Sequence, residues 1–348
     1  MTGRVLITGG AGFVGTNLAD RLLRAGRRVV VVDDLSRGGV RENLRWLEEA
    51  HPERLEVHVA DVRDAAALRR ALADVDQVFH LAAQVAVTTS VAEPMEDFGV
   101  NLGGTLTLLE ELRRMDKPPR LLFTSTNKVY GGLDDVKVQL RGSRYEARHR
   151  DYGLHGIGED RALQFCSPYG CSKGGADQYV LDYAKTYDLP AVVFRMSCIY
   201  GPHQCGNEDQ GWVAHFLMQA MSRASITLYG DGCQVRDILF VDDLLDAMAL
   251  AMAGMDRLRG QAFNMGGGPA STVSLLELLD LIADLEGRQP EVTLGAWRVG
   301  DQRWYVSDTR RFTSATGWRP RVGVEEGVDR LHRWLRRSRS GLSVAEAI

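Results

Sequence analysis

The sequence has little of what marks several large classes of protein. Its five cysteines form no C-x-x-C pair, and its eight histidines show no H-E-x-x-H or other metal spacing, so we predict reduced thiols and no metal. No apolar run approaches the roughly 20 residues of a membrane span. The net charge of −4 gives no basic excess that would suggest nucleic acid. We therefore expect neither a membrane nor a nucleic-acid partner.

The chain does have the composition of an ordinary globular protein. Its 348 residues are 45% hydrophobic and 25% charged, enough to bury a sizeable core in one large domain or two. The first strand pattern, at residues 4–8, leaves no room before it for the charged and apolar regions of a signal peptide. With the reduced thiols, this favours a cytoplasmic location.

Short apolar runs alternate with helical patterns through the first part of the chain. We expect strands at residues 4–8, 28–33, 55–60, 77–81, 120–124 and 189–194, with helices at 40–50, 64–73 and 94–115. This alternation predicts an α/β fold with a parallel, doubly wound sheet. Beyond residue 202 the alternation breaks, and helices are expected at 212–223, 241–252 and 271–286. In the last of these, Ser274 and Glu277 form a plausible capping box.

A glycine-rich turn follows the first strand. Gly9, Gly12 and Gly15 have the spacing G-x-x-G-x-x-G, and a helical pattern begins near Val14. Glycines permit a tight turn and let backbone N–H groups approach a pyrophosphate at a helix N-terminus. A lone glycine loop is often only a turn, but the order strand, turn, helix predicts a dinucleotide site here.

Asp33 ends the second strand, near the place of the carboxylate that holds an adenosine ribose 2′-OH. A carboxylate there would repel a 2′-phosphate, so the pattern favours NAD over NADP. Arg37 is the opposing feature, because a nearby arginine accommodates such a phosphate. The other expected cofactor contacts are Phe13, Val14, Asp34, Ser36, Asp61, Val62, Leu81, Ala82, Ala83, Gln84, Asn101, Thr124, Ser125 and Met196.

Tyr169 and Lys173 are the residues expected to do chemistry. They lie four apart on a predicted helix that Pro168 can begin, so their side chains share one face. A phenol with a pKa of about 10 is a poor base at neutral pH, but a neighbouring ammonium favours the phenolate. The pair could then take a proton from a sugar hydroxyl while hydride leaves the carbon that carries it. Thr126 is placed to hydrogen-bond the same hydroxyl and share its proton with Tyr169. The spacing also fits an ordinary surface pair, and Thr126 also fits a buried threonine bonded to backbone.

The second part of the chain offers two arginines in loops. Arg236 lies in a turn-rich segment, and Arg298 follows Trp297 in a later loop. Two arginines aimed at one pocket could hold a diphosphate, and they are equally compatible with surface solvation.

Together these motifs resemble the extended short-chain dehydrogenase/reductases that act on nucleotide sugars. The matching motifs occur in order from about residue 4 to about residue 335: Gly9-x-x-Gly12-x-x-Gly15, Asp33, Asp61-Val62, Ala82-Ala83, Thr126, Tyr169-x-x-x-Lys173, Arg236-Asp237 and Arg298-x-Gly300-Asp301. The resemblance implies NAD as cofactor and a Rossmann domain over residues 1–195 plus about 237–262. It implies a smaller C-terminal α/β domain for a nucleotide sugar over 196–236 and 263–348, and a homodimer or homotetramer.

Within the family, several runs resemble the subfamily of 2-epimerases that acts on CDP-paratose and CDP-tyvelose. These runs are residues 84–90, 125–131, 167–174, 176–179 and 209–213. The resemblance implies that Thr126, Tyr169 and Lys173 are catalytic. It also implies substrate contacts at Thr88, Thr126, Asn127, Lys128, Ser197, Gln210, Trp212, Arg236, Arg298 and Asp301. Met196 stands where the subfamily has histidine, Pro202-His203 replaces a Gly-Arg pair, and residues 132–166 cannot be assigned. These departures affect the prediction of the substrate more than the prediction of the reaction type.

Dehydratases of this family carry Asp-Glu directly after the catalytic Ser or Thr, whereas this chain has Asn127 and Lys128. Neither is a carboxyl acid or base, so dehydration is not expected. We predict redox-neutral inversion of a ring carbon, C2 of a CDP-linked hexose or deoxyhexose, through a transient keto-sugar. A 4-epimerase of a UDP-, GDP- or ADP-linked sugar needs the same three residues, and a non-catalytic NAD-binding sensor or scaffold is the alternative outside catalysis. The nucleotide base and the sugar stay open.

Overall fold

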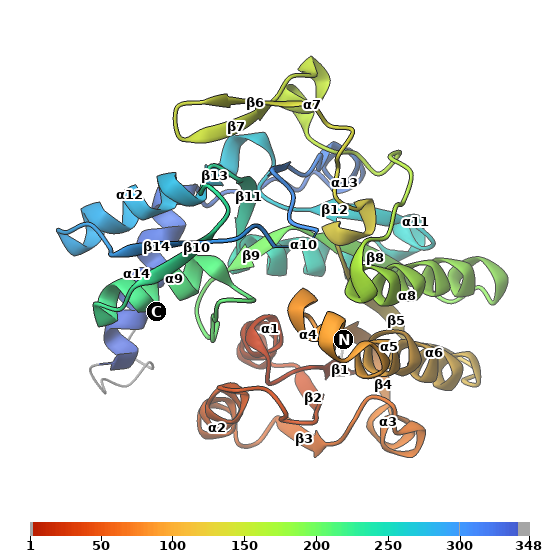
Figure 1. Ribbon diagram of the computed structural model, residues 1–348. Helices are drawn as coiled ribbons and strands as arrows, with labels where there is room; N and C mark the ends of the chain where they lie inside the picture. The colour runs from red at the N-terminus through yellow and green to blue at the C-terminus, as the bar shows by residue number, and fades with distance from the viewer. Residues whose placement is uncertain (1–2, 299, 340–348) are drawn as a thin grey trace. The chain divides into compact units, whose positions relative to one another are not determined.

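The computed structural model describes residues 3–298 and 300–339 (Figure 1). The chain divides into two compact units. Unit 1 comprises Met1–Val129, Phe165–Arg195 and Leu245–Phe263, and unit 2 comprises Tyr130–Gln164, Met196–Leu244 and Asn264–Ile348. Residues 130–164 thus belong to unit 2, whereas the sequence analysis placed them in the first domain. The end of the expected second domain, residues 340–348, lies outside the described residues.

Unit 1 is built on a seven-stranded sheet with the order β12-β8-β5-β4-β1-β2-β3. Its strands are β1 (Arg4–Thr8), β2 (Arg28–Asp33), β3 (Leu55–Val59), β4 (Val75–His80), β5 (Arg120–Thr126), β8 (Ala191–Met196) and β12 (Ala262–Met265). The strand pairs from β3 to β5 are parallel. Strands β2 and β3 follow β1 on one side of the sheet. The chain then crosses to the other side of β1, where β4, β5, β8 and β12 follow in order. This confirms the predicted doubly wound fold and places a switch point between β1 and β4, where such sheets bind ligands.

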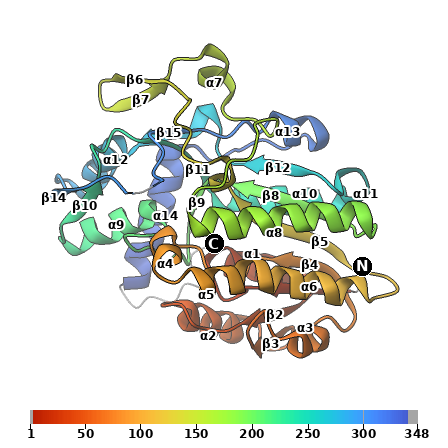
Figure 2. The same cartoon turned by 45° about the vertical axis from the view of Figure 1, so that its right-hand side comes forward.

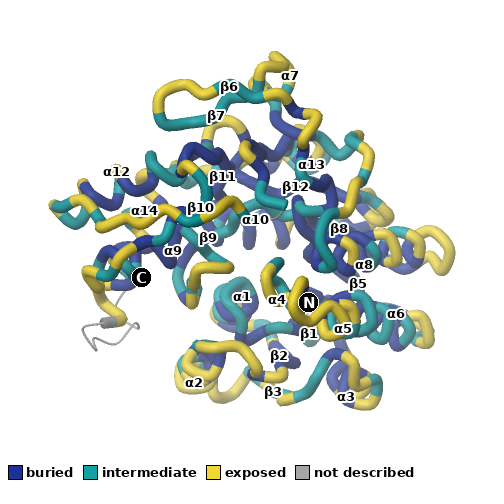
Figure 3. Tube along the Cα trace, in the orientation of Figure 1, coloured by how far each residue is buried: buried dark blue, intermediate teal, exposed yellow. Residues whose placement is uncertain are grey.

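Helices connect these strands: α1 (Phe13–Arg24), α2 (Val40–Ala50), α3 (Ala65–Ala71), α4 (Val87–Ala92), α5 (Pro94–Phe98), η1 (Gly99–Gly103), α6 (Gly104–Arg113), α8 (Ser167–Thr186), α10 (Val241–Ala253) and α11 (Met255–Leu258). In Figures 1 and 2, α6 runs beside α8. Val5, Leu6 and Ile7 of β1 are wholly buried, as expected for a parallel sheet covered on both faces. Figure 3 shows this buried sheet against the exposed outer faces of α2 and α3.

One helix of unit 1 differs from the expectation. The single helix predicted over residues 94–115 is divided into α5, the π-helical turn η1 and α6. Gly99, Gly103 and Gly104 lower the helix propensity at this turn. The wider turn contains Asn101, which is 1% exposed, and π-helical turns are frequent at functional sites.

Unit 2 contains smaller sheets. Strands β9 (Cys198–Tyr200), β11 (Val235–Phe240), β13 (Thr272–Ser274) and β15 (Trp304–Tyr305) form one, and β10 (Ile226–Tyr229) pairs in parallel with β14 (Val292–Gly295). The unit's helical segments are α7 (Arg150–His155), α9 (Trp212–Ser222), η3 (Pro269–Ser271), α12 (Leu275–Glu286), α13 (Arg310–Thr316) and α14 (Val324–Arg339), and η2 (Asn127–Tyr130) lies across the unit boundary. Within residues 3–298 and 300–339, no helix has both the length and the apolarity needed to span a bilayer.

The unassigned segment at residues 132–166 contains an antiparallel hairpin, β6 (Val138–Arg141) and β7 (Arg144–Ala147), followed by α7. Tyr145 N–H donates to the carbonyl oxygen of Cys233 at 2.9 Å, and its hydroxyl donates to Asp231 at 2.6 Å. Arg144 donates to Glu277 at 3.2 Å. The hairpin is therefore an integral part of unit 2.

The expected helix at residues 271–286 begins later, at Leu275, because residues 272–274 form β13. The capping box is present: the Ser274 hydroxyl accepts from Glu277 N–H at 3.1 Å, and Glu277 accepts from Ser274 N–H at 2.8 Å.

Ser274→Ala should lower the free energy of unfolding by about 1 kcal/mol, because the first turn of α12 loses its capping acceptor. Urea unfolding measures the change. Thr309→Ala is the matched control, since Thr309 precedes α13 without a side-chain cap and its loss should cost far less. Equal losses in the two variants would contradict this role for Ser274.

Candidate active site

The glycine turn after β1 lies directly against the end of β4. Gly9 has φ of +70°, and a Cβ on it would lie 2.7 Å from Ala82 N. A Cβ on Gly15 would lie 2.3 Å from the carbonyl oxygen of Gly9. Only glycine fits at these two positions, because backbone atoms of other residues lie where a Cβ would be. Gly12 precedes α1 with no side-chain cap, as in helix N-termini that receive anions.

Asp33, at the end of β2, is held by the same turn. Its carboxylate accepts from the N–H of Ala11 at 3.0 Å and from that of Leu35 at 2.9 Å. Burial raises the pKa of Asp33, while the two backbone hydrogen bonds oppose that rise. Arg37 also acts on this carboxylate electrostatically and favours its charged form. A carboxylate fixed in this way can accept further hydrogen bonds from ribose hydroxyls.

Some of the other expected cofactor residues have side-chain partners within the protein, and the rest are described by their place in the fold. Asp61 is engaged by Arg63, whose hydrogen bonds lower the pKa of Asp61. Asp34 accepts from the N–H and the hydroxyl of Ser36, at 3.0 and 2.7 Å. Val62 is 5% exposed. Phe13 and Val14 open α1, Leu81, Ala82, Ala83 and Gln84 follow β4, Thr124 and Ser125 lie in β5, and Met196 ends β8.

Three buried polar atoms of unit 1 lack a protein partner: Gln84 Oε1, Asn101 Oδ1 and Ser125 Oγ. Two of these residues are neighbours, because Asn101 Nδ2 donates to the carbonyl oxygen of Gln84 at 2.9 Å. Buried polar atoms normally find a partner, so these await one from outside the protein. With the glycine cradle and Asp33, they fit a bound dinucleotide.

The residues expected to be catalytic come together in unit 1. Tyr169 and Lys173 lie on α8 and are 8% and 3% exposed, and Thr126 at the end of β5 is 7% exposed. The side chain of Thr126 acts on Tyr169 and favours the ionised form of its hydroxyl, which lowers the pKa of that group. Just before Tyr169, Ser167 has φ of +69°, a left-handed conformation rare for serine. Its hydroxyl accepts from Gly170 N–H at 3.3 Å.

Burial dominates the acidity of both groups on α8. It raises the pKa of Tyr169 to about 12, although the side chain of Thr126 opposes the rise. It lowers the pKa of Lys173 to about 7, while Asp177 and Asp97 oppose that fall. In the protein alone, the phenol is thus a weaker acid than a free tyrosine, which differs from the expectation that Lys173 acidifies it. An acidic phenol requires additional positive charge at the site.

Lys173 sits among compensating groups. Its ammonium lies 4.2 Å from the centroid of the Phe123 ring. Asp177, one turn further along α8, is paired with Arg195 through two hydrogen bonds of 2.9 Å, and both residues are buried. Such a pair is costly to break from one side, so Asp177 is fixed beside the lysine.

Unit 2 brings together two of the expected substrate residues. Arg236 donates to Asp301 at 2.5 Å. Arg298 instead stacks on Tyr229, with its guanidinium 3.7 Å from the ring centroid, and donates to the carbonyl oxygen of Glu208 at 2.8 Å. Tyr229 and Glu208 were not expected at this site, and their sequence surroundings carry no motif that could have indicated it.

The remaining expected substrate residues are placed as follows. Ser197 donates to Asp237 at 2.5 Å, Trp212 Nε1 donates to Cys198 Sγ at 3.4 Å, and Gln210 N–H donates to Asn207. The side chains of Ser197 and Trp212 therefore have hydrogen-bond partners inside unit 2. In unit 1, Thr88 lies on α4, and Asn127 and Lys128 lie in η2 directly after Thr126. Lys128 N–H donates to the Thr126 hydroxyl oxygen at 3.2 Å.

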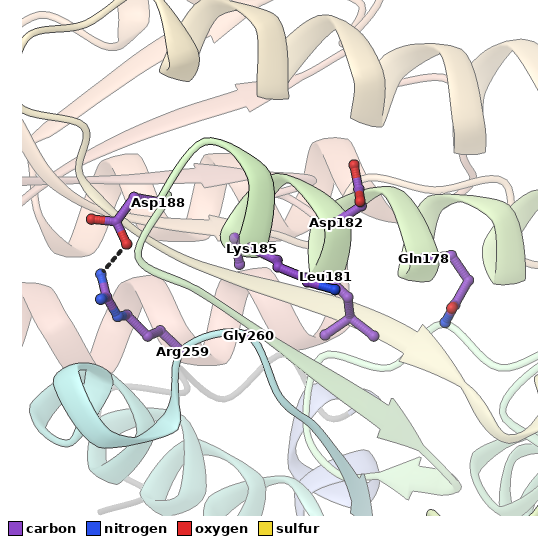
Figure 4. A pocket seen from close by; sticks show the side chains of 8 residues that line it. Gln178, Leu181, Asp182, Lys185, Asp188, Arg259 and Gly260 are labelled. Carbon is purple, nitrogen blue, oxygen red and sulfur yellow. Dashed lines mark ion pairs between the residues drawn. The ribbon is translucent and has the colours of Figure 1, made fainter.

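A surface depression beside the far half of α8 contains none of these residues. Gln178, Leu181 and Lys185 line it, and across it Asp188 pairs with Arg259 at 2.8 Å (Figure 4). Two of the charged side chains that line the depression, Asp188 and Arg259, thus pair with each other, and we assign the depression no role. Among the described residues, no group of three or more His, Cys, Asp or Glu side chains is arranged to hold a metal ion.

A glycine turn at the switch point of a parallel sheet, with a Tyr–Lys pair on a neighbouring helix, defines a dinucleotide-dependent α/β enzyme. The model of the NAD dependent epimerase/dehydratase family matches residues 5–266. The chain therefore belongs to this family of enzymes, and its cofactor is NAD.

Known relatives cover nearly the whole chain. CDP-paratose 2-epimerase of Salmonella typhi is 40% identical over 338 residues, 95% of this chain and 98% of that protein. A structure of UDP-glucose 4-epimerase from Thermus thermophilus in complex with NAD has a TM-score of 0.80 at 32% identity, covering 96% and 99% of the two chains. UDP-glucose 4-epimerase from Thermotoga maritima, solved with UDP-glucose, has a TM-score of 0.82 at 30% identity, with 96% and 99% covered.

The buried lysine predicts a pH dependence of stability. The pKa of Lys173 is about 7 in the folded protein against an ordinary 10.5, so the unfolded chain binds more protons between these values. Stability therefore rises with pH across this window, because folding must remove a proton that the unfolded lysine still holds, and this costs less as the pH rises. Relative to Lys173→Met, the wild type should gain stability as the pH rises from about 7 to about 10.

Urea unfolding at several pH values measures this difference. Lys185→Met, at an exposed position on the same helix, is the matched control and should keep the wild-type dependence. Identical pH profiles for Lys173→Met and the wild type would contradict a buried Lys173 with a lowered pKa.

Proposed function

We propose that the protein is a nucleotide-sugar epimerase that inverts C2 of a CDP-linked hexose or deoxyhexose through a transient keto-sugar. The observation that carries the proposal is the buried cluster of Thr126, Tyr169 and Lys173 in the unit that contains the glycine turn. The 40% identity to a CDP-paratose 2-epimerase supports the choice of carbon and of nucleotide.

NAD, when bound, supplies the acceptor that takes a hydride from the sugar carbon and returns it, so the overall reaction is redox-neutral. Tyr169, as phenolate, accepts the proton of the hydroxyl on that carbon and gives it back when the carbonyl is reduced. Thr126, whose side chain favours the ionised form of Tyr169, is proposed to orient the sugar hydroxyl. Because burial raises the pKa of Tyr169, Lys173 alone does not make the phenol acidic, and the further positive charge that the phenolate needs would come from oxidised NAD. Inversion requires that the keto-sugar present its other face before the hydride returns.

The residues next to Thr126 argue for epimerisation within the family. Elimination of water needs a carboxyl acid and a base there, and the chain offers Asn127 and Lys128. Neither side chain can act as a carboxylic acid. The proposal therefore keeps the sugar's carbon–oxygen bonds intact.

Unit 2 supplies the groups proposed to hold the nucleotide. Arg236 and Arg298 carry guanidinium groups that suit a diphosphate, and Asp301 already accepts from Arg236. The other expected contacts in this unit, Ser197, Gln210 and Trp212, are proposed to shape the sugar pocket.

A 4-epimerase on another nucleotide sugar is the second candidate. It is favoured by the likeness to UDP-glucose 4-epimerase from Thermotoga maritima. Because the same three residues would serve either carbon, only the way in which the sugar is held separates the two reactions.

We also propose that the enzyme is a cytoplasmic homodimer or homotetramer. Met95 and Phe98 of α5 are 78% and 50% exposed, and Tyr179 of α8 is 43% exposed. Large apolar side chains exposed on neighbouring helices are typical of association surfaces. Elution as a monomer at micromolar concentration would count against this.

Tyr169→Phe should lower turnover by about 10²- to 10⁴-fold, because the general base is lost, while NAD binding persists. NMR of the products from a panel of CDP- and UDP-sugars measures turnover and identifies the inverted carbon. Tyr187→Phe, at an exposed tyrosine at the C-terminal end of the same helix, is the matched control and should keep wild-type turnover. Near-normal activity of Tyr169→Phe would reject the role of Tyr169, and no turnover of any sugar by the wild type would favour a non-catalytic NAD-binding protein.

Turnover in deuterated water tests the hydride route. If the hydrogen leaves and returns as hydride, the inverted carbon of the product should carry no deuterium. Proton NMR of the product reads this directly. Deuterium at that carbon would instead indicate proton abstraction, and the proposed mechanism would fail.

A further inference from the structure

One buried titratable side chain of unit 1 takes no part in the chemistry proposed above. His80 ends β4, directly before the segment expected to line the cofactor site, and it is 1% exposed. Its Nδ1 lies 2.6 Å from the hydroxyl oxygen of Thr8, and its Nε2 lies 3.0 Å from that of Thr105. Both ring nitrogens are therefore committed to partners within the protein.

The partners determine which nitrogen carries the proton. The Thr105 hydroxyl donates to the carbonyl oxygen of Asn101 at 2.6 Å, so its oxygen must accept from Nε2–H of His80. In a neutral ring Nδ1 then has a lone pair, which accepts from the hydroxyl of Thr8. The Thr8 oxygen accepts in turn from Ala82 N–H at 3.4 Å. The hydrogen bonds thus run in one direction, from Ala82 through Thr8, His80 and Thr105 to Asn101.

The surroundings keep the His80 ring neutral. Burial, and then the charge of Lys173, lower its pKa to about 3. The His80 ring packs against Phe123 with 5.6 Å between ring centroids, and the Lys173 ammonium lies over the same Phe123 ring. A protonated His80 would place a second cation beside Lys173 with no carboxylate bonded to it.

We propose that His80, as the neutral Nε2–H tautomer, is a positioning residue of the cofactor site. It joins the end of β1 and the end of β4 to Thr105 at the start of α6, which bonds Asn101 in η1. The two strand ends lead to Gly9 and Ala82. Asn101 Nδ2 also donates to Ser172, the neighbour of the catalytic lysine, at 3.0 Å. The hydrogen-bond chain thus connects the glycine turn with the catalytic helix. The inference rests on NAD binding by unit 1 and is independent of which sugar is converted.

The first test observes the tautomer. In the full-length protein labelled with ¹⁵N at histidine, long-range ¹H–¹⁵N spectra distinguish a protonated nitrogen from one with a lone pair, and the His80→Gln spectrum identifies the signals. We expect His80 to be protonated only at Nε2, unchanged from about pH 8 to about pH 5. An Nδ1–H tautomer, or protonation within this range, would overturn the proposal.

The second test separates positioning from general stability. His80→Leu should weaken NAD binding roughly ten-fold, as measured by calorimetric titration, because the three segments lose their shared hydrogen bonds. Leu112→Ala, at a buried aliphatic position on α6 outside the hydrogen-bond chain, should lower the melting temperature without changing the Kd for NAD. If both variants lose stability alike and neither changes that Kd, His80 is merely structural.

Thr105→Val provides a milder variant in case His80→Leu does not fold. It keeps the shape of the side chain but removes the hydroxyl that accepts from His80 and donates to Asn101. We expect NAD binding to weaken several-fold and His80→Gln to add less in the Thr105→Val background than alone, because the two residues act through one chain. An unchanged Kd in Thr105→Val would overturn the proposal.

Discussion

The approach of two backbones, the glycine turn after β1 and the segment after β4, is the constraint on which the site depends. With Gly9 this close to Ala82, no side chain can stand between the ends of the two strands. The two strand ends are therefore in close main-chain contact, with Asp33 bonded to the turn. Backbone N–H groups of such a turn can approach an anionic cofactor because no side chain stands in front of them.

Burial disfavours the charged forms of the titratable side chains at this site, and neighbouring charges offset part of this effect. Tyr169 and Lys173 are both removed from water, which makes the phenol harder to ionise and the lysine harder to protonate. Asp177 offsets part of this for the lysine, and Arg195 in turn secures Asp177. Burial thus opposes ionisation of the phenol, and further positive charge is needed before the phenol becomes acidic.

The two units divide the proposed work. Unit 1 supplies a parallel sheet, whose buried core fixes the turn, the ends of the strands and helix α8. Unit 2 supplies Arg236 from strand β11 and Arg298 from a loop, and a loop can vary in sequence without disturbing a sheet. This division is consistent with a family of NAD-dependent epimerases and dehydratases that share a cofactor.

The sequence by itself determined the alternation of strands and helices, the glycine turn and the position of Tyr169 and Lys173 on one helix, because each follows from local spacing and residue type. It did not predict the π-helical turn at Asn101, the hairpin in residues 132–166, or the stacking of Arg298 on Tyr229. The tertiary structure decided these, and it also decided the direction in which burial moves the acidity of Tyr169. Burial and partnership arise between segments far apart in the chain, so no local pattern can encode them.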